Sequence, residues 1–213
     1  MSGTASDAAE PAAIQSVNTE ALLSAIAEKM FEHAGELTDL DQAIGDGDHG
    51  LNMKRGFEAV MDDLPAISAK PLPEALKAAG MQLVMKVGGA SGPLYGTLFM
   101  ALGKALTKTP TRDEAVAAFG EAIEAVKARG KSDVGQKTML DVLAPVHVAL
   151  SGGAGPAEVR KAAADAAQAT VAMRATKGRA SFLGERSVGH MDPGARSSQL
   201  IVEAVCDVIG GVE

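Results

Sequence analysis

Hydrophobic side chains recur at helical spacing along most of the chain. The first such segment starts behind the potential cap residues Asn18 and Thr19, where Leu22 and Ile26 lie four positions apart, and it fades near Gly35. Side chains three or four positions apart share one face of a helix, so this spacing predicts an amphipathic helix. The same pattern predicts seven further helices, over residues 50–63, 72–87, 93–107, 113–129, 137–151, 156–176 and 195–209.

The joints between these predicted helices differ in length and composition. Some are plain turns, but the longest are rich in glycine and charge, and functional sites often lie on such segments when a rigid scaffold holds them. They cover Leu37–Asn52, Val87–Thr97, Arg129–Thr138 and Lys177–Ser198. Residues 1–16 have no sustained period and are expected to form a flexible tail, while residues 17–213 are expected to form one helical domain.

Composition favours a globular, all-α protein. Of the 213 residues, 46% are hydrophobic and 22% are charged, a balance that supplies a core and argues against disorder. Trp is absent and only one Tyr and five Phe occur, whereas alanine is frequent, so helix is favoured over strand. The formal net charge of −7 argues against a general nucleic-acid binder.

Cysteine content and hydropathy bear on where the protein acts. Cys206 is the single cysteine, so no internal disulfide can form and nothing demands an oxidising compartment. The first basic residue is Lys29, whereas a secretory signal begins with basic residues, so the cytoplasm is the expected location. The longest uncharged stretch, Val87–Gly103, contains five glycines and a proline and is short for a bilayer, which argues against a membrane span.

The strongest chemical signal is an acidic segment, DLDQAIGDGDHG. Asp41, Asp46 and Asp48 lie close together in it and are interleaved with glycines. Carboxylates this close repel each other unless a cation joins them, and glycine permits the tight bends that let their oxygens converge. Hard oxygen ligands suit Mg²⁺ or Ca²⁺ better than zinc.

Two other interpretations of this segment compete with a magnesium site. An EF-hand fails because, counting from Asp46, Leu51 stands where its glycine belongs and Phe57 where its bidentate Glu belongs. A solvated acidic turn whose aspartates cap a helix is the other, and the segment alone leaves it open. Mg²⁺ usually shares its shell with substrate phosphates, so a three-aspartate loop calls for a nucleotide partner.

A glycine-rich turn, Gly88–Pro93, comes directly before an apolar helical pattern. Pro93 suits the first helical position, and a helix start offers free N–H groups to a phosphate. The turn is not a Walker loop, since no Gly-Lys-Ser/Thr follows, and its spacing does not match a dinucleotide fingerprint. Alone, it fits a close-packed helix–helix turn equally well. Beside the acidic segment, it indicates a site for metal and phosphate.

Two later segments combine glycines with cations, namely Lys131, Lys137, Arg179 and Arg186. In an acidic protein these side chains can meet phosphate or cover a base, although ordinary surface charge explains each of them as well. Met139 can pack on a purine face or fill the core. His49 directly follows Asp48 and can bind a phosphate oxygen, orient a carboxylate or stabilise the turn.

Four of these stretches resemble the nucleotide-binding L subunit of dihydroxyacetone kinases, a module that is also found as the C-terminal domain of one-chain versions. They are LTDLDQAIGDGDHGLNMKRGF, GGASGPLYGT, GKSDVGQKTMLDVLAP and GRASFLGERSVGHMDPGA, in the same order as in the family. The resemblance implies an eight-helix antiparallel barrel that binds ADP or ATP at one end. It also implies two Mg²⁺ ions held by Asp41, Asp46 and Asp48. Further phosphate or nucleotide contacts are implied for His49, Asn52, Ala90, Ser91, Thr97, Gly130, Met139, Arg179 and Asp192.

The family's ketone acceptor is bound covalently by a histidine of a separate K subunit, so this chain is expected to present the phosphoryl group. In one mode of the family ATP is a diffusing substrate; in the other, bound ADP is rephosphorylated by a phosphotransferase-system protein that carries a phosphohistidine. A free-standing L chain resembles the second mode, which is therefore preferred.

Several alternatives stay open at the level of sequence. The acceptor can be another short ketose such as a tetrulose, and the chain can be a non-catalytic, nucleotide-sensing regulatory subunit. The fatty acid kinase family has a similar domain, but its acidic loop tends to carry Thr where this chain has His49. The oligomeric state is not determined, and a homodimer is one option.

Overall fold

The computed structural model describes residues 17–210, and within that range all regular structure is helical. The tail expected at residues 1–16 lies outside the described residues. The helices are α1 (Thr19–Glu32), α2 (Ala34–Ile44), α3 (His49–Asp62), α4 (Leu64–Ser68), α5 (Leu72–Lys86), α6 (Ser91–Ala105), α7 (Arg112–Gly130), α8 (Leu140–Ser151), α9 (Pro156–Ala169) and α10 (Pro193–Gly210), with two 3₁₀ segments, η1 (Thr170–Ala172) and η2 (Arg179–Ser187).

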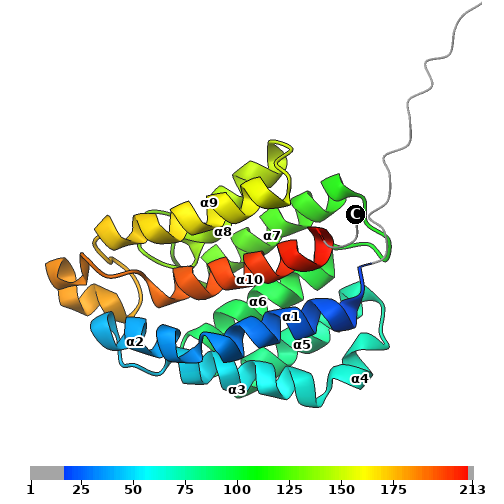
Figure 1. Cartoon of the computed structure of the whole chain (residues 1–213), viewed down its shortest axis with the longest axis horizontal. Coiled ribbons are helices and arrows are strands. Elements are labelled where there is room, and N and C mark those ends of the chain that lie inside the picture. The colour runs from blue at the N-terminus through cyan, green and yellow to red at the C-terminus, as the bar shows by residue number, and fades with distance from the viewer. Residues whose placement is uncertain (1–16, 211–213) are drawn as a thin grey trace, which may run out of the picture.

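Eight of these helices form a closed ring. Helix α1 contacts α3, α3 contacts α5, each helix from α5 to α9 contacts the next, and α10 returns to α1. Neighbouring members of the ring run in opposite directions (Figure 1). The eight helices correspond to the eight predicted segments, so the all-α, antiparallel arrangement is confirmed.

Capping and burial explain why these segments are helical. The side chain of Asn18 accepts a hydrogen bond from the Ala21 N–H at 3.0 Å, and Thr111 and Glu114 form a reciprocal capping box at the start of α7. The apolar faces meet in the ring interior, where side chains such as Phe57 are fully buried. A second cluster of buried residues lies among α8, α9 and α10.

The sequence pattern missed two helices. Helix α2 occupies the first half of the predicted Leu37–Asn52 loop and α3 begins at His49, which leaves only Gly45–Asp48 irregular. Its buried face consists of Leu37, Asp41 and Ile44, so an aspartate interrupts the apolar period from which the helix would have been recognised. Helix α4 has five residues and is too short to show a period.

Several helix starts also differ from the prediction, and those of α6 and α8 have a clear physical reason. Helix α6 begins at Ser91, two residues before Pro93, because the N–H groups of a first turn have no helical partner and proline is tolerated throughout it. Helix α8 begins at Leu140 instead of 137, since Lys137 adopts the left-handed region with φ 61°. No helix of the described part of the chain is long and apolar enough to cross a membrane.

Candidate functional site

Four irregular segments meet at one end of the barrel, drawn at the left of Figure 1. They are the α2–α3, α5–α6 and α7–α8 joints and the residues between α9 and α10. A pocket opens among them, and nine of the twelve predicted site residues line it. These nine are Asp41, Asp46, Asp48, His49, Ala90, Ser91, Met139, Arg179 and Asp192.

The three aspartates converge on one point of this pocket. Asp41, Asp46 and Asp48 each direct a carboxylate oxygen to within 4.8 Å of the other two. Asp41 is buried, and the other two are partly open to solvent. Three anionic oxygens in so small a volume are the donor set that a hard divalent cation takes, so these residues fit Mg²⁺. The guanidinium of Arg179, whose Nη2 lies 3.0 Å from Asp46 Oδ2, supplies a positive charge at the same place.

Asp41 also organises the start of α3. Its Oδ2 accepts hydrogen bonds from the backbone N–H groups of Asp48 at 2.9 Å and His49 at 3.1 Å. Burial nevertheless raises the pKa of the Asp41 carboxyl, and the nearby charges of Asp46 and Asp48 raise it further. Because its neighbours are also acidic, the Asp41 carboxylate is an electrostatically strained group that a cation would relieve.

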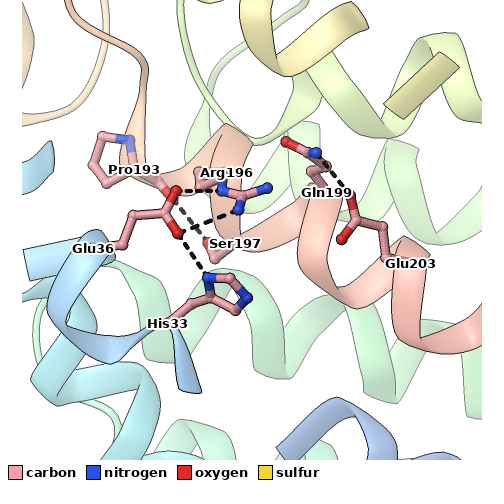
Figure 2. Close-up of polar contacts among 7 residues, drawn as sticks. All are labelled: His33, Glu36, Pro193, Arg196, Ser197, Gln199 and Glu203. Atoms are coloured by element: carbon pink, nitrogen blue, oxygen red, sulfur yellow. Dashed lines mark hydrogen bonds and ion pairs between the residues drawn. The ribbon is translucent and has the colours of Figure 1, made fainter. Parts of the chain in front are cut away.

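An ion pair holds α2, and with it Asp41, against α10. Arg196 on α10 donates from Nε to Glu36 Oε1 at 2.6 Å and from Nη2 to Glu36 Oε2 at 3.2 Å, while His33 Nδ1 lies 2.7 Å from Glu36 Oε2. Figure 2 shows these three side chains converging between the α1–α2 junction and α10. The hydrogen bond from Arg196 lowers the pKa of Glu36.

His49 lies at the centre of a buried chain of hydrogen bonds. Its Nδ1 is 2.9 Å from Ser91 Oγ, and its Nε2 is 2.9 Å from Ser197 Oγ. The Tyr95 hydroxyl lies 2.7 Å from Ser197 Oγ and donates to the Gly194 carbonyl at 2.9 Å. Burial lowers the pKa of His49 to about 4, so the imidazole is neutral near pH 7 and pairs with hydroxyls on both sides.

Ser91 joins this chain to the start of α6. Ser91 is the first residue of α6 and lines the pocket that the aspartates also line. The start of the helix therefore offers free N–H groups and the positive end of the helix dipole to this pocket. The acidic loop and the glycine turn, which lie about 40 residues apart in sequence, are therefore parts of one site.

Three predicted site residues do not line the pocket. Asn52 is buried behind the glycine turn, where a Cβ on Gly88 would lie 2.8 Å from its Oδ1. The Thr97 hydroxyl donates to the Pro93 carbonyl at 2.6 Å, within α6. Gly130 is the last residue of α7.

The predicted cations fall into two groups. Arg179 lines the pocket together with Lys177, which the sequence had not singled out, whereas the predicted Lys131 and Arg186 are not among its lining residues. Lys137 also lines it, but its Nζ donates to three backbone carbonyls, so this ammonium is not free for a phosphate. Asp192 is buried beside them, and burial raises its pKa to about 7.

Sequence reasoning missed Tyr95 and Ser197. Both lie on helices, where a polar side chain facing the core is indistinguishable by pattern from one facing solvent. The only available signal was that Tyr95 is the sole tyrosine and stands two residues after Pro93, which ends the glycine turn.

Comparisons with known proteins found a matching family model and several similar proteins. A family model described as the DAK2 domain matches residues 43–207. The "PEP-dependent dihydroxyacetone kinase 1, ADP-binding subunit DhaL" of Listeria innocua is 47% identical over 184 residues, which cover 86% of this chain and 91% of that protein. The "PTS-dependent dihydroxyacetone kinase, ADP-binding subunit DhaL" of Lactococcus lactis is 41% identical over 183 residues, covering 85% and 92%.

Among solved structures, the native dihydroxyacetone kinase of C. freundii is similar with a TM-score of 0.74 at 23% identity. The match covers 97% of this chain and 37% of that one, so this chain spans about a third of the solved chain's length. At this identity the likeness shows a shared fold.

Proposed function

The chain belongs to the DAK2 domain family, and from that premise we propose that it is the nucleotide-binding subunit of a dihydroxyacetone kinase. In this proposal it holds Mg-ADP or Mg-ATP at the open end of the barrel and presents a phosphoryl group to a ketone carried by a separate K subunit. The observation that carries the proposal is the convergence of three carboxylates within 4.8 Å beside the N-terminus of α6.

The chain's own residues have distinct roles in this proposal. Asp41, Asp46 and Asp48 hold two Mg²⁺ ions, which when bound neutralise the phosphate oxygens through which the phosphoryl group is transferred. Ser91 and the first N–H groups of α6 bind phosphate, with His49 orienting the Ser91 hydroxyl. Arg179, which lines the same pocket beside Asp46, covers the phosphates.

The remaining predicted contacts belong to the nucleotide. Met139 is buried at the pocket wall and supplies an apolar surface for a base, and Ala90 and Asp192 line the same space. Asn52, Thr97 and Gly130 support the glycine turn and the ends of α6 and α7 from outside the pocket, where Asn52 lies against Gly88, Thr97 hydrogen-bonds within α6 and Gly130 ends α7.

We propose bound ADP, recharged by a phosphohistidine-bearing protein of the phosphotransferase system, as the mode of action. The support is that relatives named as ADP-binding subunits match over 91% and 92% of their own lengths at 47% and 41% identity. The names of these relatives describe kinases that depend on PEP or on the PTS. This mode places the protein in the cytoplasm, where its K subunit and the donor are expected.

Calorimetry with the purified protein tests the nucleotide site. The Asp46→Asn and Asp48→Asn variants are expected to lose at least about tenfold in Mg-ADP affinity, because removing a metal's carboxylate ligand removes its charge as well. Asp62→Asn is the matched control, since Asp62 is exposed and is the last residue of α3, the helix that begins directly after Asp48. Undiminished binding in the first two variants would refute the site.

An activity assay tests the phosphoryl donor. The protein is mixed with K subunit and dihydroxyacetone, with either ATP or the complete phosphotransferase chain. Turnover that requires the phosphotransferase chain supports bound ADP as cofactor. Rapid multiple turnover with ATP alone would replace this proposal with the ATP-dependent mode. If adding this protein to the K subunit left the rate of dihydroxyacetone phosphorylation unchanged with either donor, the protein would be a regulatory subunit.

A further inference from the structure

Lys137 is the most deeply buried charged residue among the described residues that line the pocket. Its side chain is only 1% exposed, yet it carries an ammonium group. The Nζ donates to the backbone carbonyls of Met173 at 3.1 Å, Ser187 at 2.5 Å and His190 at 2.6 Å. An ammonium has three N–H donors, so all three are used on one segment of the chain.

The backbone around Lys137 is held in a costly conformation. Lys137 has φ 61°, a left-handed value that side chains other than glycine and asparagine rarely adopt. Asp141 fixes this turn, because its carboxylate accepts from the N–H groups of Gly135 at 2.5 Å and Thr138 at 2.7 Å. Burial lowers the pKa of Lys137. A strained backbone and a buried ammonium persist only where the surrounding structure requires them, so the contacts of Lys137 indicate its role.

The three acceptor carbonyls belong to a segment that has little regular structure of its own. Residues 173–192 contain only the 3₁₀ segment η2, and they include Arg179 and Asp192. Apart from these side-chain contacts, one backbone–backbone hydrogen bond among the described residues joins this segment to the 131–139 loop, from the Thr176 N–H to the Gln136 carbonyl at 3.3 Å. Lys137 contacts the segment near both ends, at residue 173 and at residues 187 and 190.

We propose that Lys137 is a positioning residue that fixes residues 173–192 as the cover of the pocket. The ammonium binds carbonyl groups of residues 173–192 that no neighbouring strand or helix of the described chain binds. By holding this segment in place, it keeps Arg179 beside Asp46. Lys137 acts through Arg179 and the cover and does not itself contact the phosphates. The consequence for nucleotide affinity rests on the proposed function, but the ordering of the cover does not.

The test compares Lys137→Met with Lys131→Met. Lys131 is an ideal control, because it lies in the same loop, also has a left-handed φ, 48°, and is exposed. Amide hydrogen exchange is measured on the protein without nucleotide. In Lys137→Met, exchange across residues 173–190 is expected to be at least about tenfold faster than in wild type, since hydrogen bonds from a charged donor are lost. Exchange in α5 is expected to be unchanged, and Lys131→Met is expected to match wild type throughout.

Binding measurements then separate positioning from direct contact. Lys137→Met is expected to weaken Mg-ADP binding by at least about tenfold, while Mn²⁺ alone binds with wild-type affinity because the aspartates are on other elements. Weaker Mg-ADP binding with a normally protected cover would make Lys137 a phosphate ligand and overturn the proposal. Faster exchange throughout the barrel would reduce it to a general stability residue. If wild type fails to bind Mg-ADP, the proposed function falls, and the exchange comparison alone decides whether Lys137 orders the cover.

A measurement on wild-type protein covers the case in which Lys137→Met does not fold. Reductive methylation followed by mass spectrometry reports the accessibility of each lysine amine. Lys137 is expected to react at least about tenfold more slowly than Lys131, because its N–H groups are buried and hydrogen-bonded. Equal reactivity of the two amines would overturn the proposal.

Discussion

Gly50 is the position at which one methyl group should disturb the whole acidic site. It lies in the first turn of α3, packed against α2. A Cβ placed on Gly50 would lie 1.9 Å from the carbonyl oxygen of Ala34, 2.5 Å from Thr38 Oγ1 and 2.8 Å from the Thr38 backbone nitrogen. Two of these three atoms belong to the α2 backbone, so no side-chain rotation can relieve the overlap.

The magnitude follows from two opposing effects. Replacing glycine by alanine in a helix favours folding by up to about 1 kcal/mol when nothing is contacted. Here α2 must recede by about 1.5 Å to restore ordinary van der Waals contact, and overpacking of this kind typically costs about 1–3 kcal/mol. Because the closest contact is with backbone, we take the upper end of this range, about 3 kcal/mol, and subtracting a helical gain of about 1 kcal/mol leaves an expected loss of about 2 kcal/mol in the free energy of unfolding. Because α2 also carries Asp41, the same shift should weaken the metal site.

Urea unfolding followed by circular dichroism measures this free energy, and Mn²⁺ titration measures the metal site. Gly35→Ala is the matched control, because Gly35 lies on α2 and a Cβ there meets nothing within 4 Å. Gly35→Ala is expected to leave metal affinity unchanged and to gain a few tenths of a kcal/mol. If Gly50→Ala is as stable as Gly35→Ala and binds Mn²⁺ normally, the close approach of α2 and α3 is wrong.

Three further predictions concern buried or bridging polar groups. Burial raises the pKa of Asp192 to about 7, so the folded state holds its proton more tightly than the unfolded chain does, and stability falls by up to about 1.4 kcal/mol per pH unit as pH rises from about 4 to 7. Between pH 5 and pH 8 the urea midpoint should therefore decline less in Asp192→Asn than in wild type, and equal declines would contradict the raised pKa. The pKa of Glu36 is lowered by Arg196, so this pair stabilises the fold above the ordinary value of 4.5, and the stabilisation is lost as pH falls further. Arg196→Met should cost about 1 kcal/mol or less at pH 7, and this cost should shrink as the pH is lowered; a cost that stays constant would argue against the ion pair. Tyr95→Phe removes a buried hydroxyl that donates to Gly194 and should cost about 1–2 kcal/mol in thermal unfolding, whereas an unchanged melting temperature would show that this network contributes nothing.

The candidate site was predictable to the extent that its chemistry is encoded locally. Asp46 and Asp48 lie two residues apart, so any tight turn brings them together, and their charge and the interleaved glycines pointed to a cation site. Asp41 was expected in the same loop but lies on α2, where its burial replaces an apolar residue of the helical period. The pattern failed there because the functional residue occupies a core-facing position.

Lys137 shows a second limit of local reasoning. Near glycines in an acidic chain, its charge was compatible with a phosphate contact or with ordinary surface charge, but the structure buries it against carbonyls that lie 36 to 53 residues away. The sequence cannot indicate this use, because backbone carbonyls are present at every residue and carry no compositional signal. The same holds for Tyr95 and Ser197, whose partners come from a different helix.

By itself, the sequence determined the all-α class, the eight ring helices and the donor types of the site, because helical periodicity and side-chain chemistry are properties of neighbouring residues. Closure of the ring was decided only in three dimensions, where α10 packs on α1 and brings Ser197 to His49. Tertiary packing also decided which charges are ligands and which are structural, since burial and hydrogen-bond partners depend on segments that are distant along the chain.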